Sequence, residues 1–284
     1  MQPTRHSIRY LLGGAFHRMA FVAWGEPDAP AVVCVHGLTR NGRDFDALAE
    51  NLADRFRVIC PDLPGRGESD WLPDPMYYQA QHYVTALAHL LAAIGRDVAW
   101  VGTSLGGICG MVTAATPGHP IVKLVLNDVG PSIPEAALAR IRDYMLATSA
   151  SKLMQRFPDL DAIERHLRFV HAPFGPLTDA QWAHLARISV RPLPDGCFTM
   201  HYDPGIAAPL RAIPPAAVEL WPLWDRIAIP VLAIRGELSD LLLPETLARM
   251  AASGASILTV PGTGHAPALM EAGQIAAVRA FLLA

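Results

Sequence analysis

Short apolar runs alternate with longer amphipathic stretches along most of the chain. A brief, continuous apolar run rich in β-branched residues is typical of a strand buried in a parallel sheet, and helical periodicity over a longer run indicates a helix. Runs of the first kind predict strands at Ala31–His36, Phe56–Cys60, Val98–Val101, Val122–Leu126, Ile229–Arg235 and Ala255–Val260. Two further strands, around the turn signal Gly13-Gly14, are expected at Ser7–Leu12 and Met19–Trp24. Helices are expected at Arg43–Asp54, Tyr78–Ile94, Pro244–Ala252 and in a last stretch that ends at Leu283. This alternation predicts an α/β fold with a mostly parallel, doubly wound sheet.

The alternation of apolar runs and amphipathic stretches stops in the middle of the chain, between residues 129 and 227. This segment is rich in proline and scattered aromatic residues, and it contains helix-like runs at Glu135–Ser149 and Asp161–Val170 but no clear buried-strand pattern. Such a length does not fit an ordinary loop of a compact domain. We interpret residues 129–227 as a helical insertion over the ends of the strands, with 1–128 and 228–284 forming the core. The alternative is a set of structural helices away from any site.

Composition narrows the class of protein. The 284 residues are 51% hydrophobic and 17% charged, with a net charge of −3 and no basic run, which argues against nucleic acid or an anionic membrane surface as a partner. No apolar stretch reaches the ~20 residues of a membrane-spanning helix, and the N-terminal apolar stretch is too short for a signal peptide. The widely spaced cysteines favour a reduced, cytoplasmic protein; they are Cys34, Cys60, Cys109 and Cys197.

A candidate nucleophile follows the predicted strand Val98–Val101. Residues 102–106 read Gly-Thr-Ser-Leu-Gly and continue into a run of helical character. A G-x-S-x-G motif between a strand and a helix is typical of a nucleophile elbow, which exposes the serine hydroxyl on a sharp turn. Gly102 and Gly106 lack a Cβ, so strand and helix can approach each other around Ser104. The helix also begins at the serine, and its free N–H groups favour negative charge beside the hydroxyl.

With this motif the chain resembles the α/β-hydrolase superfamily, specifically its small, capped, esterase-like members. The resemblance covers nearly the whole chain except the middle third, where such relatives carry a cap or lid. It implies an eight-stranded, mostly parallel sheet with an inserted helical cap. Relatives that open epoxides or remove halides have a carboxylate nucleophile at the elbow, so Ser104 argues against both chemistries.

A serine nucleophile needs a base and a carboxylate that orients the base. His265 lies in a glycine-flanked loop after the last predicted strand, and Asp240 follows the strand before it. The order Ser104, Asp240, His265 is that of the α/β-hydrolases. Asp128 also follows a strand directly, where some relatives carry their acid, although a turn-forming role is the alternative there. Asp62 is interpreted as structural.

Hydrolysis also requires donors for the oxygen that becomes negative in the transition state. The first expected donor is the amide of Leu105, the residue after the nucleophile. The second is the amide of Leu38, because the sequence His36-Gly37-Leu38 resembles the oxyanion loop of the family. His36 is interpreted as a brace of this loop rather than a second base. No metal is expected, since histidine and cysteine spacings match no metal motif, and no cofactor is expected, since no nucleotide-binding glycine pattern is present.

We therefore predict a serine hydrolase that cleaves a small or medium carboxylic ester through an acyl-enzyme. Related enzymes that cut carbon–carbon bonds in ring-fission acids remain an alternative. They usually carry Asn before the serine, where this chain has Thr103, and Arg40 and Arg43 could meet the carboxylate of such an acid. An alternative of another class is a ligand-binding receptor that keeps the triad. Neither the natural substrate nor the oligomeric state follows from the sequence.

Overall fold

An eight-stranded sheet forms the centre of the part of the chain that the computed structural model describes, residues 2–149 and 155–284. Its strand order is β1-β2-β4-β3-β5-β6-β11-β12. The first two strands form an antiparallel hairpin at one edge, and the strands from β4 to β12 run parallel. The strands are β1 (Thr4–Leu12), β2 (Ala15–Trp24), β3 (Ala31–Val35), β4 (Arg57–Pro61), β5 (Val98–Thr103), β6 (Ile121–Asn127), β11 (Val231–Gly236) and β12 (Ser256–Val260). The fold class predicted from the sequence is confirmed.

Helices cover both faces of this sheet, which explains why the central strand β3 is apolar throughout. All five residues of β3 are buried, and successive side chains of a strand point to opposite faces. Val33 and Val35 pack with side chains of α2 and α3, whereas Val32 and Cys34 pack with those of α1 and α10. The core helices are α1 (Asp46–Leu52), α2 (Ala80–Ile94), α3 (Leu105–Ala114), α9 (Pro244–Ala252) and α10 (Ala272–Leu283).

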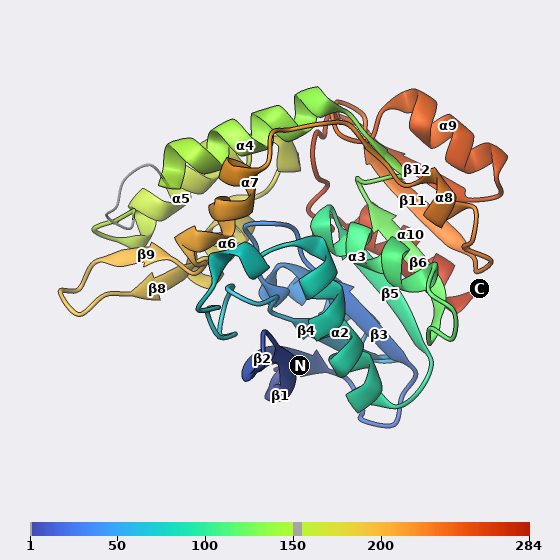
Figure 1. Ribbon diagram of the computed structural model, residues 1–284, viewed down its shortest axis with the longest axis horizontal. Coiled ribbons are helices and arrows are strands. Elements are labelled where there is room, and N and C mark those ends of the chain that lie inside the picture. The colour runs from blue at the N-terminus through green and yellow to red at the C-terminus, as the bar shows by residue number, and fades with distance from the viewer. Residues whose placement is uncertain (1, 150–154) are drawn as a thin grey trace.

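A mainly helical insertion lies between β6 and β11 and covers one end of the sheet (Figure 1). The two helices expected there are confirmed, within one residue of their predicted bounds. Very short strands that the sequence pattern did not reveal also occur in this insertion. Its helices are α4 (Glu135–Ser149), α5 (Leu160–Val170), η3 (Ala172–Phe174), α6 (Asp179–Ile188), η4 (Pro204–Ala207), α7 (Ala208–Ala212) and α8 (Trp221–Trp224). Its strands pair as β7 (Ser132–Ile133) with β10 (Val218–Glu219), and β8 (Val190–Pro192) with β9 (Phe198–Met200).

The insertion is attached to the loops that follow the parallel strands. The Asn41 side chain donates a hydrogen bond to the Ile188 carbonyl, 2.6 Å away, in the loop after β3. The Gly264 amide donates to the Pro173 carbonyl at 2.8 Å, in the loop after β12. Apolar side chains of α5 and α6 also belong to the same buried cluster as those of α2 and α3. The insertion therefore packs as a continuation of the core on that face.

Across the described residues, every helix is too short or too polar to cross a lipid bilayer.

Candidate active site

The chain turns sharply at Ser104, where β5 gives way to α3 (Figure 1). Ser104 has a φ of 51°, a left-handed conformation that residues other than glycine rarely adopt. Strain of this kind persists only where the surrounding structure enforces it, as active sites often do. A Cβ on Gly106 would collide with the carbonyl of Val35, and one on Gly102 with the backbone of Gly106. The two glycines are therefore required by close backbone approach, as the motif predicted.

His265 connects Ser104 to a buried carboxylate. Its Nε2 lies 2.9 Å from Ser104 Oγ, and its Nδ1 lies 2.7 Å from Asp128 Oδ2. A carboxylate only accepts hydrogen bonds, so the proton of the neutral ring is on Nδ1 and Nε2 accepts from the serine hydroxyl. The structure thus brings together Ser104 and His265, which the sequence predicted as partners 161 residues apart.

Asp128 occupies the position that the sequence analysis assigned to Asp240. It follows β6 directly, has a φ of 56° and is fully buried. Besides His265, it accepts hydrogen bonds from the amide of Gly236 at 2.8 Å and from the hydroxyl of Ser239 at 2.6 Å. Three donors compensate the removal of this charge from water.

Asp240 itself points away from the histidine, which corrects the predicted order Ser104, Asp240, His265. Its side chain is 50% exposed and forms a bidentate ion pair with Arg140 of α4, at 2.6 and 2.8 Å. The physical reason lies one residue earlier, where Ser239 turns inward to donate to Asp128. The loop after β11 therefore supplies a donor to the buried carboxylate instead of a carboxylate to the histidine.

The residues expected to supply oxyanion donors flank Ser104. Leu105 is the first residue of α3, and the first N–H groups of a helix have no partner within it. Gly37 lies against the elbow, since a Cβ built on it would be 3.7 Å from the Cβ of Ser104. The neighbouring amide of Leu38 thus belongs to a loop that passes directly beside the serine.

The hypothesis that His36 braces this loop is confirmed. The ring is fully buried, and its Nε2 accepts a hydrogen bond from the amide of Leu63 at 2.9 Å. The proton is then on Nδ1, which donates to the carbonyl of Gly37 at 2.7 Å. Burial lowers the pKa of His36 to about 3, so the ring is neutral at pH 7 and both nitrogens are used.

Two arginines near the site are already paired. Arg40 is buried and donates to both carboxylate oxygens of Asp44, at 2.8 and 2.7 Å. Arg43 pairs in the same way with Asp46. Their charges are therefore compensated within the protein, which weakens the case that they meet the carboxylate of a ring-fission acid.

Asp62, interpreted as structural, has that role in the loop after β4. Its two carboxylate oxygens accept hydrogen bonds from the amides of Gly42 and Glu68, at 2.8 and 2.9 Å. Burial raises the pKa of Asp62 to about 6. Asp62 therefore connects the loops after β3 and β4, and its carboxylate is not a partner of His265.

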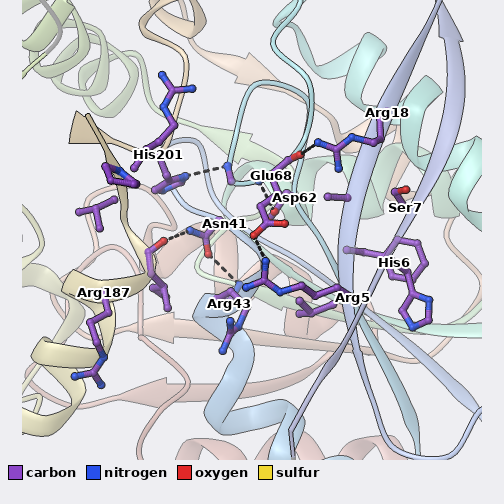
Figure 2. A pocket seen from close by; sticks show the side chains of 18 of the residues that line it. Arg5, His6, Ser7, Arg18, Asn41, Arg43, Asp62, Glu68, Arg187 and His201 are labelled. Atoms are coloured by element: carbon purple, nitrogen blue, oxygen red, sulfur yellow. Dashed lines mark hydrogen bonds and ion pairs between the residues drawn. The ribbon is translucent and has the colours of Figure 1, made fainter. Parts of the chain in front are cut away.

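A large groove lies elsewhere, between the β1–β2 hairpin and the end of α6 (Figure 2). Its volume is about 1030 Å³, and Ser104, Asp128 and His265 are not among its lining residues. Arg5 and Arg18 both reach Glu68 in this groove, whereas Arg187 points away from them (Figure 2). A much smaller cavity, about 30 Å³, lies beside the elbow and is lined by residues that include Gly37, Thr103, Phe174 and Ala266.

Comparisons with known proteins identify relatives of this chain and of its fold. A model of the alpha/beta hydrolase family matches residues 32–278. A 3-hydroxybutyrate-oligomer hydrolase from Cupriavidus necator is 42% identical over 291 residues, which cover 98% of this chain and 97% of that protein. A pimeloyl-(acyl-carrier protein) methyl ester esterase from Xanthomonas campestris pv. campestris is 31% identical over 255 residues, covering 87% and 92%. The crystal structure of an alpha/beta hydrolase from Novosphingobium aromaticivorans is similar with a TM-score of 0.87 and 38% identity, covering 99% of this chain and 98% of that chain.

Proposed function

Because the chain belongs to the alpha/beta hydrolase family and is an ester hydrolase, we propose that Ser104, His265 and Asp128 form its catalytic triad. The observation that carries this proposal is the continuous hydrogen-bonded chain between them, with distances of 2.9 and 2.7 Å. The strained φ of Ser104 supports it as well, because backbone strain of this kind clusters at active sites. The carboxylic ester substrate is a small molecule.

The triad performs acyl transfer in two steps. Ser104 Oγ attacks the ester carbonyl carbon while His265 Nε2 takes the hydroxyl proton, and the same proton then passes to the departing alcohol. Water attacks the resulting acyl-enzyme, His265 again takes a proton, and the carboxylic acid leaves as Ser104 regains its hydrogen. Asp128 keeps the imidazole in the tautomer that accepts at Nε2 and stabilises the imidazolium that forms.

The amides of Leu38 and Leu105 are proposed to bind the oxyanion of both tetrahedral intermediates. Such donors act best when they are already in place before charge develops, because no reorganisation is then needed at the moment of reaction. The start of α3 at Leu105 and the bracing of the opposite loop by His36 support this assignment.

The triad is tested by replacing Ser104 with alanine. A phosphonate ester probe should label the native protein and not the folded Ser104→Ala variant, and ester hydrolysis should fall by several powers of ten. Far-ultraviolet circular dichroism controls for folding. Labelling of the variant at the native rate would remove Ser104 from the mechanism.

The proposed substrate is a short linear oligoester of a hydroxyalkanoic acid such as 3-hydroxybutyrate. The support is the 42% identity to the 3-hydroxybutyrate-oligomer hydrolase, which extends over nearly the whole of both chains and therefore includes the insertion. We expect the dimer and trimer to be hydrolysed with a kcat/KM at least tenfold above that of a straight-chain fatty ester of the same length. Preference for the fatty ester, or for a dienoic ring-fission acid, would contradict this substrate class.

The insertion is proposed to act as a cap that selects the substrate, with residues 129–227 as the cap and 1–128 with 228–284 as the core. Phe174 supports this role, because it belongs to the insertion and lines the small cavity beside the elbow. Phe174→Ala should change the ratio of kcat/KM between short and long esters while phosphonate labelling of Ser104 stays within about threefold. An unchanged ratio would contradict the proposed role.

A further inference from the structure

A fully buried arginine lies beneath the loop that passes the nucleophile. Arg66 belongs to the loop after β4, has no exposed surface, and among the described residues forms no ion pair with a carboxylate. Taking a guanidinium out of water without a counter-charge is costly. The contacts of Arg66 offset part of this cost, and its Nη2 has no hydrogen-bond partner among the described residues. Neither the triad nor the oxyanion donors proposed above make use of this residue.

The contacts of Arg66 are carbonyls, a phenol and aromatic faces. Its Nε donates to the carbonyl of Leu38 at 2.9 Å, and its Nη1 donates to the carbonyl of Pro64 at 2.7 Å and to the hydroxyl of Tyr83 at 2.6 Å. The guanidinium carbon lies 4.8 Å from the ring centre of Tyr83 and 5.6 Å from that of Tyr78. Only one of these contacts, that to Leu38, leads to the loop beside Ser104.

The loops after β3 and β4 are connected by two hydrogen bonds, one from a side chain of each loop. His36 of the first loop accepts from the amide of Leu63 in the second, and Arg66 of the second donates to the carbonyl of Leu38 in the first. Each contact pairs a buried side chain with a main-chain group, so both fix the backbone itself. The first loop cannot shift relative to the second without breaking two buried hydrogen bonds.

These contacts determine where the Leu38 amide points. The carbonyl of Gly37 accepts from His36 Nδ1 at 2.7 Å and from the amide of Arg40 at 3.3 Å. The peptide bond between Gly37 and Leu38 is trans, so the Leu38 N–H points opposite to that carbonyl. The next carbonyl, that of Leu38, is held by Arg66. With both peptide planes held, the backbone torsions of Leu38 have little freedom.

We propose that Arg66 is a positioning residue for the oxyanion donor at Leu38. It acts through the Leu38 carbonyl and keeps the neighbouring amide in place as the tetrahedral intermediate forms. The proposal rests on the proposed function of the Leu38 amide. It predicts an effect on the transition state and little effect on the binding of substrate, because the ground-state ester does not yet carry the charge that the amide binds.

The test replaces Arg66 with methionine, which is similarly long, apolar and unable to donate. Loss of a complete oxyanion donor typically lowers kcat by ~10²–10³, so loss of its positioning should lower kcat by roughly 10- to 100-fold, with KM within about twofold. Arg66→Lys keeps one donor and should recover part of the loss. Tyr83→Phe is the matched control, since it removes another partner of the same guanidinium and leaves the Leu38 contact intact; its kcat should stay within about threefold.

A second measurement separates positioning from general damage. A boronic acid that forms a tetrahedral adduct with Ser104 should bind more weakly to Arg66→Met by the factor lost in kcat/KM, whereas a carboxylate product should bind equally well. Three outcomes would overturn the proposal. They are a folded Arg66→Met with native kcat, a rise in KM of Arg66→Met as large as its fall in kcat, and a fall in the kcat of Tyr83→Phe equal to that of Arg66→Met. If Arg66→Met fails to fold, the kcat of Arg66→Lys compared with that of Tyr83→Phe decides the same question.

The boronic acid also keeps this proposal distinct from the ester substrate. If the native protein binds the boronic acid at Ser104 but hydrolyses no oligoester, the substrate class fails while the role of Arg66 is still decided by the boronic acid affinities.

Discussion

The loops after β6 and β11 lie side by side at the same end of the sheet, and each contains an aspartate. The two strands are paired in parallel, with Leu126 opposite Ala233 and Asn127 opposite Ile234. Asp128 is fully buried against His265, whereas the side chain of Asp240 is half-exposed. Both carboxylates lie in a loop that follows a buried parallel strand, Asp128 directly after β6 and Asp240 further along the loop after β11.

The difference lies in the donors that each carboxylate meets. The loop after β11 directs the amide of Gly236 and the hydroxyl of Ser239 toward Asp128, and these donors make a buried charge acceptable there. Asp240 pairs with the guanidinium of Arg140 at the surface. The hydrogen bonds that the loop after β11 supplies therefore distinguish Asp128 from Asp240.

The largest effect that distinguishes the two aspartates is expected for Asp128→Asn. An asparagine amide can donate to Nδ1 of His265, which would leave the proton on Nε2 and prevent it from accepting the serine proton. We expect kcat for a nitrophenyl ester to fall by about 10⁴-fold, with the fold preserved. Asp240→Asn, the matched control, should stay within about twofold. The opposite ranking of the two variants would return Asp240 to the triad.

A smaller effect is expected when the acid is moved to the other loop. Ser239 Oγ lies 2.6 Å from Asp128 Oδ2, so a carboxylate at position 239 can reach the neighbourhood of the histidine. The double variant Asp128→Asn with Ser239→Asp should regain at least about tenfold of the kcat lost in Asp128→Asn. No recovery in a folded double variant would mean that only the loop after β6 can hold the acid.

Removing only the donor should have a moderate effect. Ser239→Ala takes away one of the three hydrogen bonds of the buried carboxylate, and a bond to a charged group contributes about 1.5–3 kcal/mol. We expect kcat to fall by roughly tenfold and the free energy of unfolding to fall by about 1–2 kcal/mol, measured by urea denaturation. Native kinetics together with native stability would show that Gly236 and His265 suffice to hold Asp128.

The proposed nucleophile Ser104 and the proposed base His265 could be predicted from sequence because their signals are local. The elbow needs Gly102 and Gly106 within five residues of chain, and their requirement follows from a turn whose geometry the motif fixes. His265 lies in a glycine-flanked loop directly after a strand. The main strands and helices were predictable for a similar reason, since burial on both faces produces a continuous apolar run.

The proposed acid, Asp128, could not be predicted because its signal is spread over distant residues. Asp128 depends on Gly236 and Ser239, which are more than a hundred residues away along the chain. The β7–β10 and β8–β9 pairs are two or three residues per strand, too short to carry a period. Arg66 stands in a glycine-rich loop where an arginine is ordinarily exposed, and its burial depends on the aromatic rings of Tyr78 and Tyr83.

The smallest effect is expected for the ion pair of Asp240 itself. Asp240 and Arg140 are both about half-exposed, at 50% and 51%, and water screens a pair at such a surface. The bidentate geometry fixes how the two side chains are oriented, but an exposed pair typically contributes about 0.2–1 kcal/mol to stability. Asp240→Asn should therefore lower the free energy of unfolding by less than about 1 kcal/mol, and Arg140→Gln should give a similar value.

The double variant should lower the free energy of unfolding no more than either single one, because both break the same pair. The difference from the native protein should shrink in about 1 M salt, where charges are screened within a few ångström. A loss of kcat above about tenfold in Asp240→Asn with unchanged stability would contradict the surface role and place this carboxylate in the chemistry.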